Sequence, residues 1–108
     1  MTVKGLCDKT GLKPLILPEE DREIEGVYCG DLLSWVMGRA QSGNAWITIM
    51  SNINVIAVAS LSDVSCVILA ESVVLDEDAQ EAAKNKGINI ISSEKSAYEL
   101  ALLLGNVL

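Results

Sequence analysis

The chain has 108 residues, half of them apolar, and a formal net charge of −7 with a pI of about 4.4. A chain of this size with no linker predicts a single domain over residues 1–108 with a real hydrophobic core. The acidic balance argues against nucleic acid, which is bound by clustered Lys and Arg, and against an anionic membrane surface.

The N-terminal residues contain no apolar core of the kind found in a signal peptide. Residues 45–70 are rich in Ile, Val and Ala, but two asparagines and Asp63 interrupt them. A central Asp is poorly tolerated in a membrane-spanning helix. We therefore expect this segment to be buried core.

The three cysteines, Cys7, Cys29 and Cys66, are widely spaced, and the chain contains no histidine. An odd number of cysteines without a C-x-x-C pair argues against a disulfide scaffold and against a zinc site. The composition favours a reducing, cytoplasmic compartment.

The first predicted elements are a short helix and a short edge strand. The helix covers residues 3–10, and Gly11 after it favours a left-handed C-cap. Residues 15–17 lie between two prolines, which predicts an edge strand because Pro cannot donate to a ladder. A charged loop over 19–25 then leads into a strand around residues 24–28.

A helix from residue 30 to 40 and a strand over 46–49 are predicted next, with Asp31 as a cap or a dipole partner for the helix. Residues 53–64 are ambiguous, because their apolar spacing is helical whereas their β-branched content favours a strand. We favour a helix, because a serine and an asparagine precede it as good N-caps and a strand of this length would be unusual.

The remaining elements are clearer. The unbroken apolar run over 66–69 predicts a strand in a sheet covered on both faces. A helix over 76–86 has acids in its first turn and lysines in its last, and a strand over 88–91 follows. The last helix covers 96–104, with Gly105 after it. Because strands and helices alternate from the second strand onward, we predict an α/β domain of three layers: a mostly parallel sheet of about five strands with helices on both faces.

Polar residues follow four of the predicted strands. In an open parallel sheet, ligands bind outside the carboxyl ends of the strands, where the following helices direct free N–H groups. The predicted ligand-binding candidates are Gly30, Asp31, Ser51, Asn52, Asn54, Glu71, Ser72, Ser92 and Ser93. The alternative is that these serines and asparagines are ordinary helix caps.

Three acids, Asp31, Glu71 and Glu94, fall at the same predicted edge. They would oppose a phosphate unless a metal ion or an arginine intervened. A magnesium site built from them is a less favoured alternative, and we predict no metal and no cofactor.

The sequence lacks the common catalytic sets. Without histidine there is no Ser-His-Asp or Cys-His arrangement, and neither a Walker loop nor a G-x-G-x-x-G motif is present. Cys29 precedes a predicted helix, where a thiolate is favoured, but Asp31 two residues later would counter that effect. We therefore predict no catalytic residue, with an enzyme using Cys29 or the acidic edge as the least favoured alternative.

Five segments in order carry a family resemblance: YCGDLLSWVM, GNAWITIMSN, NVIAVASLSDVSCVILAES, DEDAQEAAKNKG and INIISSEKSAYELA. Across residues 28–100 the chain resembles the DRTGG domain, particularly its small stand-alone bacterial members. The resemblance implies a compact α/β fold similar to the N-terminal domain of HPr kinase/phosphorylase. It also implies a regulatory, dimer-forming role without catalysis.

The chain departs from that family in two loops. Typical members carry Gly-Asp-Arg after one strand and Thr-Gly-Gly after the next. The matching residues here are Met-Ser-Asn at 50–52 and Ala-Glu-Ser at 70–72. The arginine and the glycines would let a phosphate approach closely, so their loss weakens an inherited nucleotide site.

We therefore expect a cytoplasmic, non-catalytic regulatory or protein-interaction module that forms a homodimer. The alternative is a sensor for a nucleotide or another polar metabolite, read out by a partner protein. Stand-alone members of this kind are expected beside redox or signalling genes, which makes a redox or signalling protein a candidate partner. Trp35 and Trp46 are predicted to lie in the core, with anchoring of an interface as the alternative.

Overall fold

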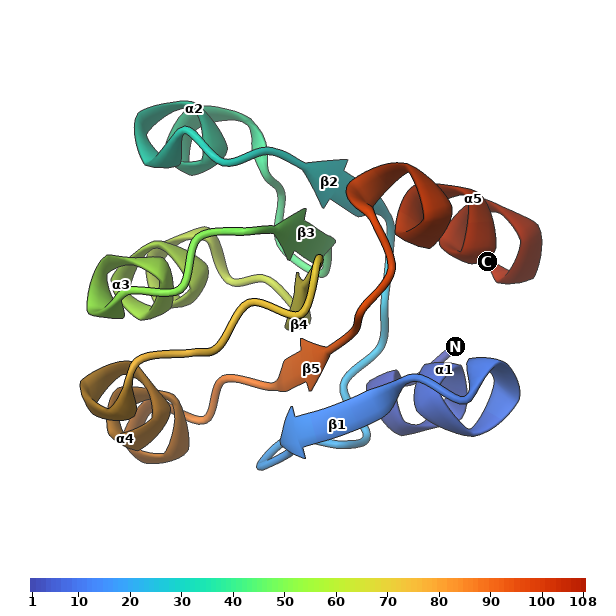
Figure 1. Cartoon of the computed structure of the whole chain (residues 1–108), viewed down its shortest axis with the longest axis horizontal. Coiled ribbons are helices and arrows are strands. Elements are labelled where there is room, and N and C mark those ends of the chain that lie inside the picture. Colours follow the sequence, from blue (N-terminus) through green and yellow to red (C-terminus); the bar gives the residue numbers. More distant parts are fainter.

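A five-stranded sheet lies between two layers of helices in the computed structural model, which describes residues 1–108 (Figure 1). The strands are β1 (Lys13–Ile16), β2 (Val27–Cys29), β3 (Ala45–Thr48), β4 (Cys66–Leu69) and β5 (Ile90–Ser92). The helices are α1 (Val3–Thr10), α2 (Leu33–Arg39), α3 (Ile53–Ser62), α4 (Glu77–Lys86) and α5 (Ala97–Val107).

The strands lie in the order β1-β5-β4-β3-β2. Strands β2 to β5 are parallel, and β1 pairs with β5 in the antiparallel sense. Helices α2, α3 and α4 cover one face of the sheet, and α1 and α5 cover the other (Figure 1). The predicted α/β class, the three layers and the mostly parallel sheet are confirmed.

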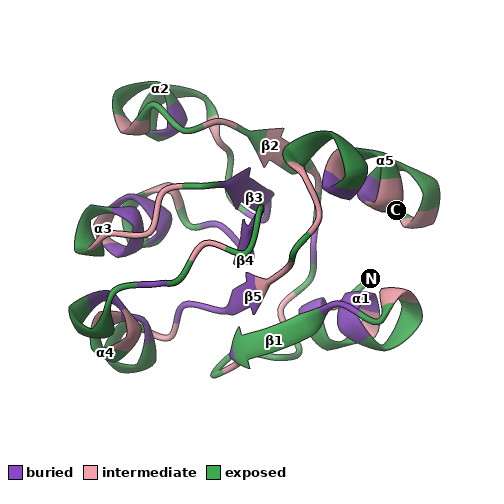
Figure 2. Cartoon of the chain, viewed as in Figure 1, coloured by how far each residue is buried: buried purple, intermediate pink, exposed green.

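Burial rises toward the middle of the sheet (Figure 2). Every residue of β3 and β4 is buried, because helices cover both of their faces. Two hydrophobic clusters fill the two faces: Trp46 belongs to the cluster under α2, α3 and α4, and Cys66 to the cluster under α1 and α5. The two edge strands, β1 and β2, are mostly exposed.

The ambiguous segment after β3 is helix α3. The side chain of Asn52 accepts a hydrogen bond from the N–H of Asn54, which caps the first turn as predicted. Val55, Ile56 and Val58 are buried against the sheet and the neighbouring helices. This burial outweighs the weak helix propensity of β-branched residues.

The tryptophan prediction is right for Trp46, which is fully buried, and wrong for Trp35, whose side chain is 55% exposed. Helix α2 is the outermost helix of its layer, beside edge strand β2, so one side of it has no neighbour (Figure 1). The guanidinium of Arg39 lies 3.9 Å from the centre of the Trp35 ring. Such stacking stabilises an exposed ring without burying it.

Three predicted boundaries are also corrected. Gly105 lies inside α5, because burial of Leu104 holds the helix through another turn. The second strand begins at Val27, because Ile24 is held instead by the N-terminal segment, to which its N–H donates. The first strand begins at Lys13 and includes Pro14, which an edge strand tolerates.

None of the five helices has the length and hydropathy that a membrane span requires.

Candidate functional site

The carboxyl ends of β2 to β5 meet along one rim of the sheet, as the parallel order requires. Ser92 is the last residue of β5, and the other eight predicted candidates lie in the loops after these four strands or in the first turn of α3. Their polar groups do not converge on one site, however. The structure divides them into a half after β2 and β3 and a half after β4 and β5.

In the first half, the polar groups of Gly30, Asp31 and Asn52 form hydrogen bonds within the chain. One carboxylate oxygen of Asp31 accepts hydrogen bonds from the Thr48 hydroxyl at 2.8 Å and from the Ile49 N–H at 2.9 Å. The carbonyl of Gly30 accepts a hydrogen bond from the indole N–H of Trp46 at 2.8 Å. Of the two roles predicted for Asp31, the cap is wrong, because its side chain ties the loop after β2 to the end of β3 and makes no capping hydrogen bond to α2.

The loop after β3 is also used by the fold. Asn52 caps α3 through the N–H of Asn54, so its side-chain oxygen serves the helix. The backbone carbonyl of Ser51 accepts a hydrogen bond from the N–H of Asp76 at 3.0 Å, which links this loop to the start of α4. Asn52 is therefore an ordinary helix cap, as the alternative interpretation of the sequence predicts.

The loop after β4 has an unusual backbone. Glu71 and Ser72 have φ angles of 60° and 58°, a region that favours glycine. The resemblance to the DRTGG domain places two glycines at these positions, so the turn keeps a glycine-like conformation without glycine. Their N–H groups donate to the carbonyls of Lys95 and Ser93, both at 2.9 Å, and are unavailable to an anion.

A cavity of about 520 Å³ lies in the second half of the rim, bounded by the loops after β4 and β5 and by the start of β1. We call it the β1–β5 cavity. Its polar lining consists of Thr10, Lys13, Ser72, Gln80, Ser92, Ser93, Glu94 and Lys95. Its apolar lining consists of Leu12, Leu15, Val73, Val74 and Leu75.

Three predicted candidates, Ser72, Ser92 and Ser93, line the β1–β5 cavity, and the other six do not. Sequence reasoning missed Lys13 and Lys95. Lys95 closely follows the predicted serines, so its place in that loop was a usable signal. Lys13 had no such signal, because only the antiparallel pairing of β1 with β5 sets it opposite Ser92.

The charges of the rim do not form a metal site. No group of three or more acid or cysteine side chains is arranged to hold a metal ion, so Asp31, Glu71 and Glu94 are not gathered. No carboxylate lies within 4 Å of the ammonium group of Lys13 or Lys95, and the ion pairs of the chain involve other residues. The β1–β5 cavity therefore has two ammonium groups without a paired charge.

Cys29 lies on exposed strand β2, outside the β1–β5 cavity. Partial burial raises the pKa of its thiol, and the nearby charge of Asp31 raises that pKa further. A nucleophilic cysteine needs the opposite shift, because the thiolate is the reactive form. The environment of Cys29 therefore gives no activation.

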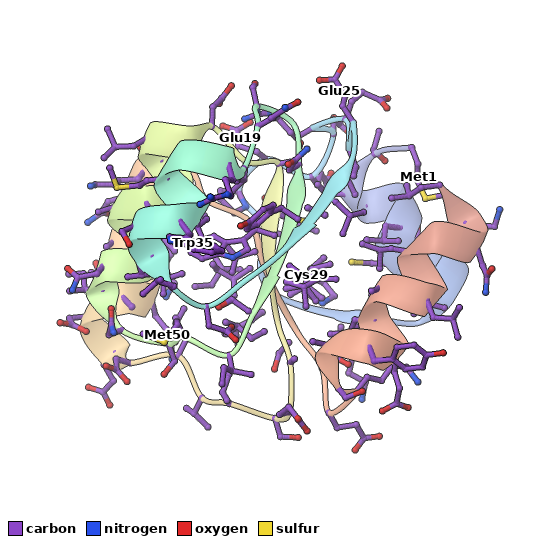
Figure 3. All side chains as sticks on the ribbon, turned by 90° about the horizontal axis from the view of Figure 1, so that it is seen from above. Met1, Glu19, Glu25, Cys29, Trp35 and Met50 are labelled. Atoms are coloured by element: carbon purple, nitrogen blue, oxygen red, sulfur yellow. The ribbon has the colours of Figure 1, made fainter.

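A second surface of interest surrounds strand β2. Val27 and Cys29 on β2, Leu32 before α2 and Trp35 on α2 are all exposed. Figure 3 looks onto this edge of the sheet, with Cys29 on the strand and Trp35 on the helix beside it. We call these four residues the β2 edge surface.

No protein-family model matches the chain, and no curated protein matches it. A solved structure that it resembles contains the CBS and DRTGG domains of the regulatory region of Clostridium perfringens pyrophosphatase, in complex with the activator diadenosine tetraphosphate. The TM-score is 0.77 at 16% sequence identity, over 94% of this chain and 45% of that one. The fold is DRTGG-like. This agrees with the resemblance seen in the sequence, and the chain spans less than half of the length of that structure.

Proposed function

We propose that this chain is a non-catalytic regulatory module that acts by binding protein, and that its first partner is a second copy of itself. The observation that carries this proposal is the β2 edge surface, where an unpaired strand lies beside exposed apolar side chains. The likeness to a regulatory region of a pyrophosphatase supports the regulatory part of the proposal.

The β2 edge surface is poor in charge. Residues 27–38 contain one charged side chain, Asp31, in a chain with 15 acids. That carboxylate is already bonded to Thr48 and Ile49. An acidic protein that associates with itself must bring like charges together, and a surface with one carboxylate and the Arg39 guanidinium over Trp35 lowers that repulsion. Exposed tryptophan beside other apolar side chains is also typical of interfaces.

The outer side of β2 has no strand partner, so its N–H and C=O groups are available to another chain. Two copies related by a twofold axis would place β2 beside β2 in the antiparallel sense. Each copy would then present the same surface to the other, which closes the assembly as a dimer. Leu32 and Trp35 would flank the strand pair.

Sedimentation of a matched pair of double variants tests this proposal. Val27→Lys with Leu32→Lys adds two charges to the β2 edge surface, at one strand and one loop residue that are 37% and 60% exposed. Leu15→Lys with Val74→Lys makes the same kind of change at the opposite sheet edge, at 46% and 79% exposure. Because all four side chains are partly or largely exposed, we expect folding to be preserved in both variants.

The wild-type chain and the Leu15/Val74 variant should sediment as dimers, and the Val27/Leu32 variant as a monomer. A wild-type chain that remains monomeric at high micromolar concentration would contradict self-association. Equal weakening by both variants would instead place the interface elsewhere.

A second candidate function, a sensor for a small polar metabolite, is favoured by the β1–β5 cavity. Its volume falls within the range of small-molecule sites, and its lining combines five apolar residues with eight polar ones. A thermal-shift screen of nucleotides and polar metabolites tests it, since a ligand at 100 times its Kd stabilises the folded chain by about 2.7 kcal/mol. If no compound in the panel raises the melting temperature, the sensor function is rejected and only the interaction module remains.

A further inference from the structure

We propose that the β1–β5 cavity binds a small organic phosphate monoester, with the ammonium groups of Lys13 and Lys95 holding the phosphate. This inference rests on the sensor function above and does not depend on self-association. It assigns a ligand class and the residues that recognise it.

The two lysines are the first reason for an anion. Lys13 and Lys95 line one cavity, although 81 positions separate them, because β1 pairs with β5. Neither ammonium group has a carboxylate within 4 Å; Lys95 is partly buried and Lys13 is exposed. Two ammonium groups therefore line one cavity in a protein of net charge −7, and an anionic ligand would neutralise them.

Free hydrogen-bond donors are the second reason, and they favour phosphate over carboxylate. The hydroxyl groups of Ser72 and Ser92 make no hydrogen bond within the chain. The N–H groups of Val74 and Leu75 also have no acceptor in the chain. Together with the lysines these are six donor groups, more than the two oxygens of a carboxylate require. A phosphate monoester, with three terminal oxygens, uses them more fully.

The size and the apolar wall indicate an ester. A cavity of about 520 Å³ is much larger than a phosphate ion, and Leu12, Leu15 and Val73 provide apolar surface for the organic part. The exposed carboxylate of Glu94 can accept hydrogen bonds from hydroxyl or amino groups of that part. It also opposes additional negative charge. A dianionic monoester therefore matches the two lysines better than a polyphosphate does.

Calorimetric titration of the full chain tests this assignment, with adenosine 5′-monophosphate, adenosine, inorganic phosphate and diadenosine tetraphosphate as probes. The monophosphate should bind one per chain, more tightly than the other three, and more weakly as salt increases. The Lys13→Gln, Lys95→Gln double variant should lose about tenfold or more in affinity, because two charge-assisted contacts are removed.

The control is Lys84→Gln with Lys86→Gln, which makes the same charge change in the last turn of α4, outside the cavity, and should leave the affinity unchanged. Equal binding of adenosine and its monophosphate would overturn the phosphate assignment while supporting the sensor. Tighter binding of diadenosine tetraphosphate would overturn the monoester preference. Absence of binding by all four probes would overturn the phosphate inference, and the wider metabolite screen would then judge the sensor separately.

Discussion

Both edge strands of this sheet, β1 and β2, lie between the two helix layers, but the polar groups near them are used differently. At the β2 edge the polar groups of Gly30 and Asp31 are bonded within the fold, and apolar side chains are exposed. At the β1 edge the surface is hollow, with free donors and two unpaired lysines. Polar groups at a strand end that already form hydrogen bonds within the fold are unavailable to a ligand.

The largest expected effect concerns how firmly the β1 edge is attached. The buried amide of Asn89 donates to the carbonyls of Glu19 and Ser65 at 2.8 and 2.9 Å and accepts from the N–H of Glu19 at 2.9 Å. Asn89→Ala should lower the free energy of unfolding by about 3 kcal/mol, because three hydrogen bonds are lost and buried partners remain unpaired. Urea denaturation measures the loss.

The matched control is Asn54→Ala, since Asn54 is exposed and its side chain makes no hydrogen bond. That variant should change the free energy of unfolding by less than about 0.5 kcal/mol. Equal stability of the two variants would mean that Asn89 does not hold β1 in place, and that the cavity is not preformed.

A change at the β2 edge should cost less. Asp31→Ala should lower the free energy of unfolding by about 1–2 kcal/mol, because the buried hydroxyl of Thr48 and the N–H of Ile49 lose their acceptor. Asp31→Asn keeps an acceptor oxygen and should restore most of that stability. Affinity for adenosine 5′-monophosphate should stay unchanged in both variants, and its loss would move the ligand site to this half of the rim.

A still smaller effect is expected at the left-handed turn after β4. Non-glycine residues in this conformation cost roughly 1–2 kcal/mol each, and glycine adds entropy to the unfolded chain worth about 0.4–1 kcal/mol. Glu71→Gly with Ser72→Gly should therefore raise the free energy of unfolding by about 1 kcal/mol. The control is Glu94→Gly. Because the φ angle of Glu94 is not positive, this glycine should lower the free energy of unfolding. A loss of stability in the double variant would show that the two side chains hold the turn.

The last prediction concerns the rate at which iodoacetamide modifies the cysteines. Cys29 should be the one thiol of the native chain that iodoacetamide modifies, because Cys7 and Cys66 are buried. Burial raises the pKa of Cys66 to about 12, and the raised pKa of Cys29 should make it react more slowly than free cysteine at pH 8. Mass spectrometry of samples taken over time measures the rate at which Cys29 is modified and the rate at which free cysteine is modified under the same conditions. A rate above that of free cysteine would revive an enzyme that uses Cys29.

Much of the fold could be predicted from local patterns. The helix near residues 76–86 has acids at its start, lysines at its end and Gly87 after it, and these signals act within one or two turns. The alternation of short apolar runs with helical segments was sufficient for a parallel sheet. Predicted boundaries differ from the structure where a distant partner decides them, as the N-terminal segment does for Ile24.

The class of fold and the rim on which polar residues gather could be inferred from the amino-acid sequence alone, because the hydrophobic period and the alternation of strands with helices are local patterns. The exposure of Trp35 follows from the tertiary structure, because its helix α2 lies at the edge of its layer and has no neighbour on one side. The tertiary structure also decided that Asp31 serves the fold and that Lys13 joins Lys95 at a cavity. The hydrogen bonds of Asp31 and the proximity of Lys13 to Lys95 both depend on contacts between residues far apart in the sequence. Such contacts cannot be predicted from spacing along the chain.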